Sequence, residues 1–393
     1  MKETMRKGFW TEGQGNGKKE ESEYIFSHTD LILELQEEQA AFREKGQGSG
    51  PFRKKAQGDG LFRKEGQGDG TFRKEEKGQG FRVERREQNG GRLREIVITI
   101  EDDRGERIFG KPRGVYITLE GVNLAENDGA FHEEMSALLA KHLERLLGER
   151  EKVLIAGLGN RDVTPDALGP LVVDNLMITG HLGEVSFFEK MRSSMAVAPG
   201  VMAQTGMETR EILQGIIGRT KPEALVVIDA LAAKTAERLN RTVQISDAGI
   251  APGAGVGNER REISEKTMGI PVIAIGVPTV ISIPAVAGDI LSAVLTADKT
   301  EESSAGSGQV ACGADGIRMT GRLREGEEEK ELSQETEAFL RWTDRQRYEF
   351  LSQRLPKELF GLFVTPKEID ESVKRISYTI SEGINRVIAR TVS

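Results

Sequence analysis

The stretch Leu154-Ile155-Ala156-Gly157-Leu158-Gly159-Asn160 decides the fold, because in it an apolar run passes directly into a glycine-rich turn. A short apolar run bounded by glycine is typical of a strand that is buried on both faces. Thr164-Pro165-Asp166 follows the turn, and threonine before proline favours the start of a helix. A strand, a turn and a helix in this order are the repeating unit of a parallel sheet.

Similar units recur along the chain. Apolar runs or alternating patterns predict further strands at 94–100, 114–120, 224–228, 242–245 and 271–277. Helical spacing of apolar residues predicts helices at 131–147, 208–217 and 285–295, and two charged helices at about 331–354 and 366–389. We therefore expect an α/β fold with a mainly parallel, twisted sheet and helices on both faces.

The overall composition limits the possible functions. The 393 residues carry a formal net charge of -8, which argues against nucleic-acid binding by the chain as a whole. The single cysteine, Cys312, allows no intramolecular disulfide and fits a reducing compartment. The longest apolar stretch free of charge, 267–288, is interrupted by three prolines and is not typical of a membrane span, and the first 21 residues lack the apolar core of a signal peptide. We expect a cytoplasmic protein with no membrane contact.

A tandem repeat interrupts this pattern. Phe-Arg recurs every ten residues from Phe42 to Phe72 and once more at Phe81, with glycine-rich spacers. So few apolar side chains predict a disordered insertion over 42–90. Basic residues interleaved with aromatic ones can bind single-stranded nucleic acid, so nucleic acid is a possible partner through this segment only. The alternative is a solvated linker.

Two aspartates are the candidate catalytic residues. Asp166 follows the first strand, and Asp229 comes directly after the apolar run 224–228. Carboxyl ends of parallel strands meet at one edge of a sheet, where ligands bind. Two carboxylates that meet there can share a proton and activate a water, with Asp166 as the base and Asp229 as the protonated partner. The structural alternatives are a carboxylate in the first turn of a helix for Asp166 and a strand-end residue that binds backbone amides for Asp229.

Glycine-rich segments are the candidate substrate-binding elements. The first is the turn with Gly159 and Asn160, and the second is the loop 247–260 with Gly255, Gly257 and Asn258. Their backbone amides can hold a substrate or stabilise an oxyanion, and the alternative for the loop is a flexible connection. The turn lacks the third glycine of the dinucleotide fingerprint, so we predict no cofactor. The four histidines show no metal-ligand spacing, so we predict no metal.

Several of these segments resemble the germination protease family of spore-forming bacteria. The resemblance is carried by 110–120, 157–160, 164–170, 198–209, 228–232, 246–258 and 269–280. It implies an atypical aspartic endopeptidase that degrades small acid-soluble spore proteins in the spore core during germination. It also implies a homotetramer and a fold similar to that of hydrogenase maturation peptidases. The two key aspartates of the family correspond to Asp166 and Asp229.

The resemblance also implies a zymogen that removes its own propeptide. Because the family cuts after glutamate and before an apolar residue, we expect cleavage between Glu23 and Tyr24, within a candidate propeptide of residues 1–28. The expected organisation continues with a peptidase domain at 29–297, which contains the insertion at 42–90. A loop or insertion at 298–330 and C-terminal helices at 331–393, packed on the peptidase domain, complete it.

Two other functions stay open from the sequence. A peptidyl-tRNA hydrolase-like enzyme also has Gly-Leu-Gly-Asn after a strand, but it needs a histidine soon after the turn, and His181 comes too late. A non-catalytic binding protein, tethered by its repeat, is the other possibility. The intact Asp166 and Asp229 favour the enzyme.

Overall fold

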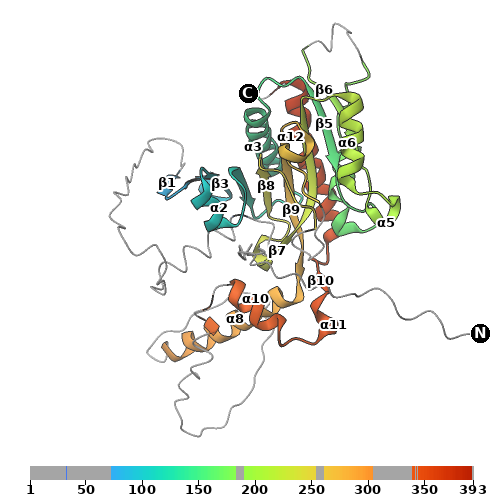
Figure 1. Ribbon diagram of the computed structural model, residues 1–393. Coiled ribbons are helices and arrows are strands. Elements are labelled where there is room, and N and C mark those ends of the chain that lie inside the picture. Colours follow the sequence, from blue (N-terminus) through green and yellow to red (C-terminus); the bar gives the residue numbers. More distant parts are fainter. Residues whose placement is uncertain are drawn as a thin grey trace, which may run out of the picture.

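The computed structural model describes residue 32 and residues 72–182, 190–253, 261–303, 339, 340, 342 and 344–391. Its strands form one mixed sheet in the order β1-β2-β3-β4-β8-β9-β7-β5-β6, with β10 beside β9 (Figure 1). The strands are β1 (Phe72–Gly78), β2 (Phe81–Gln88), β3 (Leu93–Ile100), β4 (Gly114–Gly121), β5 (Lys152–Gly157), β6 (Ser193–Val197), β7 (Ala224–Ala233), β8 (Thr242–Ser246), β9 (Val272–Ser282) and β10 (Phe363–Val364).

Helices and 3-10 turns connect these strands. The helices are α2 (Asp103–Phe109), α3 (Gly129–Leu147), α4 (Leu168–Asp174), α5 (Met202–Thr205), α6 (Thr209–Thr220), α7 (Glu265–Met268), α8 (Ile283–Ser303), α10 (Asp344–Ser352), α11 (Lys357–Phe360) and α12 (Ile369–Ala389). The 3-10 turns are η1 (Asn89–Gly91), η2 (Thr164–Asp166) and η3 (Ala236–Arg238). The helix α8 continues to Ser303, into the segment expected to be a loop, and residues 304–330 lie outside the described part.

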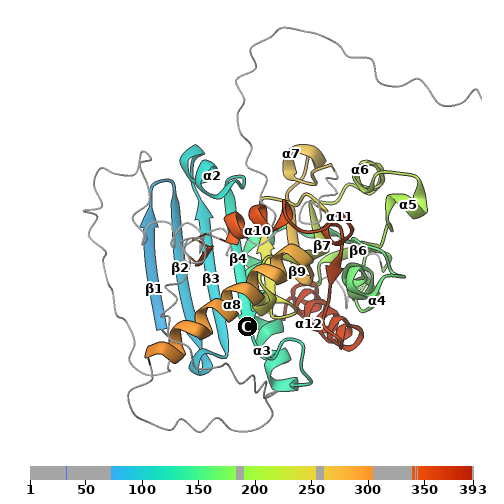
Figure 2. The same cartoon turned by 90° about the horizontal axis from the view of Figure 1, so that it is seen from below.

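The parallel half of the sheet consists of β6, β5, β7 and β9. Successive residues of β5 face opposite sides: Ile155 packs in one core with α3, α4 and α12, and Leu154 packs in another with α6 and α7. Figure 2 shows the two groups of helices on opposite sides of these strands. The α/β class with helices on both faces is confirmed.

The other half of the sheet is antiparallel, so the sheet is mixed. β8 lies between β4 and β9 and is antiparallel to both. Only the two residues Gln79 and Gly80 separate β1 from β2, and η1 links β2 to β3. Such short connections can join antiparallel neighbours only, because a parallel pair needs a crossover of a dozen residues or more. The sequence analysis did not predict these turns, because they lie in the repetitive segment 72–90.

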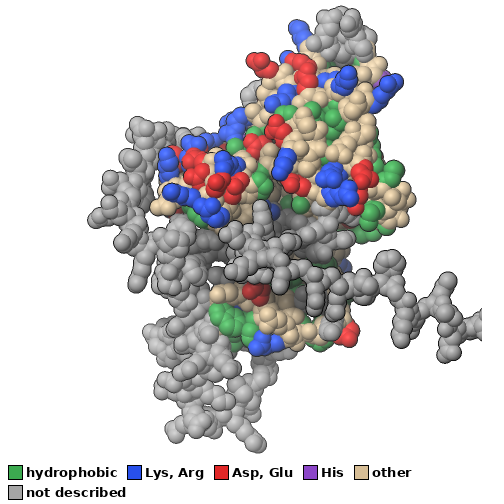
Figure 3. Space-filling model, in the orientation of Figure 1, with side chains coloured by type: hydrophobic (Ala, Val, Ile, Leu, Met, Phe, Trp, Pro, Cys, Tyr) green, Lys and Arg blue, Asp and Glu red, His purple; other side chains and the backbone are tan. Residues whose placement is uncertain are grey.

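Part of the predicted disordered insertion is ordered. Residues 72–90 form β1, β2 and the start of η1, so the prediction of disorder does not hold there, whereas 42–71 lie outside the described residues. Phe81 and Val83 explain the difference, because they are buried in a core with Phe109 of α2. Side chains of both charges cover this end of the molecule (Figure 3).

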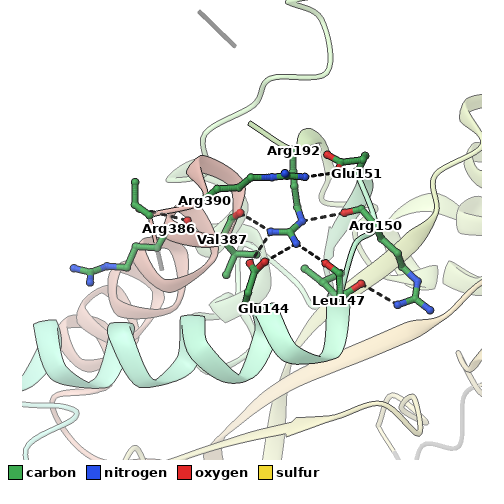
Figure 4. A network of polar contacts seen from close by, with 10 residues as sticks. Glu144, Leu147, Arg150, Glu151, Arg192, Arg386, Val387 and Arg390 are labelled. Carbon is green, nitrogen blue, oxygen red and sulfur yellow. Dashed lines mark hydrogen bonds and ion pairs between the residues drawn. The ribbon is translucent and has the colours of Figure 1, made fainter. Parts of the chain in front are cut away.

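A buried arginine fastens the C-terminal helix to the body. Arg192, just before β6, is 2% exposed, and its guanidinium donates to both carboxylate oxygens of Glu144 at 2.6 and 2.7 Å. It also donates to the carbonyl oxygens of Gly148, Arg150 and Val387 (Figure 4). The carbonyls of Gly148 and Val387 lie at the ends of α3 and α12, where a helix leaves its last acceptors unpaired, and Arg150 lies between α3 and β5. Arg192 therefore joins α3, β6 and α12.

The structure offers no candidate for a membrane span within the described ranges: none of their helices combines the length and hydropathy needed to cross a bilayer.

A second buried charge lies between the antiparallel strands and α3. Glu95 of β3 is 2% exposed, its Oε1 accepts a hydrogen bond from Arg86 at 3.1 Å, and His142 Nε2 lies 3.3 Å from the same oxygen. Burial alone raises the pKa of Glu95, but the close approach of His142, followed by the charge of Arg86, outweighs burial and holds the pKa below its ordinary value. The carboxylate is therefore stabilised in its charged form.

We predict that Glu95 makes stability depend on pH. Its contribution is present above the pKa of glutamate in the unfolded chain, about 4.3, and is lost as the pH falls through the lower pKa of the folded protein. Glu95→Gln should be less stable than the wild type at neutral pH. The difference between their free energies of unfolding should become smaller in acid. Urea unfolding at both pH values measures this, with Glu101→Gln on the exposed end of the sheet as a control. A gap independent of pH would refute the prediction.

Candidate functional site

The topology directs attention to the ends of β5 and β7. The connection that leaves β5 leads outward to β6, whereas the connection that leaves β7 leads in the opposite direction, to β8 and β9. A crevice opens at such a switch point, between the carboxyl ends of two parallel strands. Asp166 follows β5, and Asp229 lies in β7.

Asp166 ends a 3-10 turn and not the first turn of an α-helix. Its turn, η2, is followed by α4, and the hydroxyl of Thr164 does not cap either element. The predicted N-cap at Thr164 is therefore wrong, because Val163 takes that position and the chain winds tightly before α4 starts. Asp166 N donates to Val163 O at 2.8 Å, which closes the turn.

Three glycines let this turn lie directly on the end of β5. A Cβ at Gly157 would clash with the carbonyl of Gly169, and a Cβ at Gly169 would clash with the backbone of Leu158. Gly159 has a φ of 106°, and a Cβ there would strike the carbonyl oxygen of Asp166. The glycine-rich turn therefore allows close backbone packing, which is a role that glycine alone can fill here.

The carboxylate of Asp166 is held from within the turn. The side chain is half-buried, and its Oδ2 accepts a hydrogen bond from the backbone N–H of Asn160 at 2.6 Å. A backbone amide at this distance stabilises the ionised form of a carboxylate. The contact therefore suits a group that accepts a proton.

Asp229 lies inside β7 and not at its end. β7 continues to Ala233 because β9 remains paired with it, with Gly276 opposite Asp229. On the other side β5 ends at Gly157, opposite Ile228, so Asp229 is the first residue of β7 beyond β5. Asp229 is 5% exposed, and its Oδ1 accepts the N–H of Ala230 at 3.0 Å. The carboxylate thus occupies a buried position at the place where β5 leaves the sheet.

The turn of Asp166 is fixed to the strands that flank Asp229. η2 contacts both β7 and β9. The hydroxyl of Thr279, a fully buried residue of β9, donates to the carbonyl of Pro165 at 2.7 Å. The structure therefore brings the segments of the two predicted catalytic residues together at one edge. Thr279 was not singled out from the sequence, since a threonine in an apolar strand gives no local signal.

Gln204 is a second site residue that the sequence analysis missed. Its Nε2 donates to Asn160 Oδ1 at 2.8 Å and to Asp162 Oδ2 at 3.3 Å, and so it ties α5 to the turn. Asn160 Oδ1 also accepts the N–H of Asp162 at 3.0 Å. These bonds engage the side chain of Asn160 within the protein and leave its substrate-binding role a prediction.

The tips of the same two segments carry exposed apolar side chains. Val163, Met202 and Met207 are each about half exposed. Figure 3 shows apolar side chains gathered over α5. Because Gln204 holds α5 against residues 160–162, an apolar rim lies beside the turn of Asp166.

The second glycine-rich loop is described only at its ends. Gly255, Gly257 and Asn258 lie outside the described residues, as do the predicted cleavage residues Glu23 and Tyr24. Ile263 packs in the same core as Leu158, and Arg261 pairs with Glu211 in the first turn of α6 at 3.0 Å. The returning end of the loop is therefore held against α6, on the face of the sheet where Leu158 is buried.

Asp247, where this loop starts, is not part of the carboxylate pair. β8 is antiparallel to β9, with Ser246 opposite Ala274, so Asp247 lies at the amino edge of the parallel strands. Burial raises the pKa of Asp247, while the N–H of Val115, 2.7 Å from its Oδ1, acts against this rise. Across the described residues, no group of three histidine, cysteine or carboxylate side chains is arranged to hold a metal ion.

We predict that Gly159→Ala damages both the fold and the site. Its methyl group would collide with the carbonyl of Asp166, so we expect a loss of about 3 kcal/mol in unfolding free energy. Gly206→Ala is the matched control, because Gly206 also has a positive φ of 71° but nothing lies within 4 Å of its added Cβ. Strain alone should cost about 1 kcal/mol there. Denaturant unfolding of both variants measures the difference, and equal losses would contradict the close packing.

Comparisons with known proteins show which family this chain belongs to. A sequence model described as germination protease matches residues 62–393. The germination protease of Caldanaerobacter subterraneus subsp. tengcongensis is 38% identical over 312 residues, which cover 76% of this chain and 86% of that one. The germination protease of Bacillus pumilus is 38% identical, with 78% and 85% covered, and that of Bacillus subtilis is 37% identical, with 79% and 87% covered.

A solved structure, the NiFe hydrogenase maturation protease HycI from Thermococcus kodakarensis KOD1, aligns with a TM-score of 0.25 and 20% identity, over 35% of this chain and 80% of that one. The sequence matches extend through β5, η2 and β7. They favour a protease over a peptidyl-tRNA hydrolase-like enzyme and over a non-catalytic binding protein. The chain belongs to the germination protease family and is a proteolytic enzyme.

Proposed function

We propose that Asp166 and Asp229 hold one water molecule between them and hydrolyse peptide bonds of small acid-soluble spore proteins during germination. The observation that carries the proposal is the attachment of η2 to β7 and β9, which brings the turn of Asp166 to the strand of Asp229 at the switch point of the sheet. Carboxylates in two different environments are what a general base and a general acid require.

The two environments suggest the division of roles. Asp166 accepts a backbone N–H and is half-buried, so it is the base that takes a proton from water as the water oxygen attacks the substrate carbonyl. Asp229 is almost fully buried, which favours a neutral carboxyl group, and it donates its proton to the leaving nitrogen as the C–N bond breaks. The proton gained by Asp166 then passes through an incoming water molecule to Asp229, which restores the ionised Asp166 and the neutral Asp229 of the starting state.

The surroundings suit an extended peptide. The apolar rim of Val163, Met202 and Met207 can receive an apolar side chain beside the bond that is cut. Backbone amides of the turn at Gly159 and Asn160, and of the loop at Gly255, Gly257 and Asn258, are proposed to bind the peptide and to stabilise the oxyanion. Neither step requires a cofactor or a metal ion.

Regulation and assembly are proposed on the basis of the family. The chain is made as a zymogen, residues 1–28 are its propeptide, and the active enzyme is a homotetramer in the spore core. The propeptide is removed by the enzyme itself, at a site that matches the preference for glutamate followed by an apolar residue.

We predict that Asp166→Asn and Asp229→Asn each lower kcat by a factor of about 10² to 10⁴. Asparagine keeps the shape of the side chain but can neither take up nor release the proton. Mass spectrometry of a small acid-soluble spore protein after incubation with each variant measures the cleavage rate. Asp174→Asn, which removes an exposed carboxylate paired with Arg161, is the control and should keep full activity. An Asp229→Asn enzyme with more than a few percent of wild-type turnover would rule out the two-carboxylate scheme.

We further predict that purified protein, on storage, acquires a new N-terminus at Tyr24. N-terminal sequencing detects this end, and Asp166→Asn protein, stored alongside, should keep Met1. Ragged ends in both proteins would show that other proteases trim the chain.

A further inference from the structure

Arg210 is a half-buried charged residue that the proposed mechanism does not use. It lies in the first turn of α6, and its Nε is buried. Within the described ranges, its guanidinium donates no hydrogen bond and pairs with no carboxylate. A buried donor without an acceptor costs free energy. A ligand that supplies an acceptor would recover this free energy.

The helix α6 places Arg210 at the edge of the sheet where Asp166 and Asp229 lie. Because β6, β5 and β7 are parallel, the crossover from β6 to β7 runs from the carboxyl edge of these strands back to their amino edge (Figure 1). α6 therefore starts at the carboxyl edge. Side chains of a helix lean towards its amino end. The guanidinium of Arg210 is thus directed to the carboxyl edge and not along the body of α6.

Arg210 also lies on the face of the sheet to which the side chain of Asp229 points. Leu213 and Ile217 of α6 pack in one core with Val227 of β7. Alternate residues of a strand share a face, so Asp229 lies on the same face as Val227. Arg210 precedes Leu213 by three positions and Ile217 by seven, which places it on the side of α6 that faces the sheet.

Two other described arginines near this edge are already neutralised. Arg161 binds Asp174 through both of its Nη atoms, and Arg261 pairs with Glu211 at 3.0 Å. Of these three arginines, Arg210 is the one whose charge is available to a ligand.

The apolar rim adjoins Arg210 in the chain. Met202 of α5 and Met207 belong to this rim, and α6 starts two residues after Met207. One continuous stretch, 202–210, therefore carries exposed apolar side chains and a free positive charge. These groups match a peptide in which an acidic residue adjoins an apolar one.

Given the peptidase site proposed above, on which this inference rests, we propose that Arg210 binds the carboxylate of the substrate glutamate that precedes the cut bond. The two carboxylate oxygens accept hydrogen bonds from Nε and from one Nη, an arrangement in which the planar guanidinium and the carboxylate match. Arg210 thereby determines the residue after which the enzyme cuts.

Two peptides that differ only in the residue before the cut bond test this role. Each chain is first passed over immobilised wild-type enzyme, so that differences in self-processing do not enter. In kcat/KM, the wild type should cut the peptide with glutamate about 10 to 100 times faster than the peptide with glutamine. Arg210→Gln should cut both peptides at the rate at which the wild type cuts the glutamine peptide.

The matched control is Arg219→Gln, which removes an exposed arginine from the last turn of the same helix and should keep the preference for glutamate. An Arg210→Gln enzyme that also keeps this preference would overturn the proposal.

A binding measurement separates the role of Arg210 from the catalytic scheme. Fluorescence anisotropy of the labelled glutamate peptide is recorded with Asp229→Asn chains, in which no cleavage is expected. Adding Arg210→Gln should raise the Kd by a factor of about 10 to 100. If Kd rises in this way although the wild type cuts neither peptide, Arg210 keeps its role and the two-carboxylate scheme fails. Equal Kd values would overturn the role of Arg210, whether or not the wild type cuts the peptides.

Discussion

The contact between the end of β5 and the backbone of residues 166–169 is the constraint on which the site depends. Gly157 and Gly169 let two stretches of main chain touch, and Gly159 lets the carbonyl of Asp166 lie where a side chain would otherwise be. Because this contact involves backbone on both sides, no flexible side chain can move to relieve an added Cβ. The position of the Asp166 carboxylate is therefore set by the course of the main chain. The hydrogen bond from the N–H of Asn160 then fixes the orientation of the carboxylate.

The same contact explains why Asp229 can be buried in a strand. β5 stops at Gly157, so β7 loses a neighbour after Ile228, and the turn that leaves β5 fills part of the space. A carboxylate in the middle of an apolar strand is costly unless a polar group or a ligand compensates it. On the other side of β7, the pairing with β9 continues past Asp229. β9 also supplies the Thr279 hydroxyl that fixes the turn. Burial of one aspartate and partial exposure of the other thus follow from a single strand end.

The sequence predicted the elements whose signals are local. The strand, glycine turn and helix around Asp166 were found because apolar runs and glycine spacing carry that information. Gln204 and Thr279 were missed, because their roles depend on contacts across 44 and 114 positions of the chain. The sequence predicts disorder for β1 and β2, because each has few apolar residues. The buried Phe81 and Val83 gain their stability from α2 and β3, not from the repeat. The length of β7 beyond Asp229 likewise depends on β9, and no local pattern encodes it.

The C-terminal helix is distant in sequence yet tied to the site. α12 packs against α3 and α4 and also contacts η2, the turn that carries Asp166. Its far end is held by Arg192, which binds carbonyls of both α3 and α12 and the carboxylate of Glu144. A buried arginine adds little net stability compared with apolar packing, but it allows one arrangement only, in which every donor meets an acceptor. Arg192 therefore fixes the position of α12. α12 in turn packs against α4, the helix that follows Asp166 in the chain.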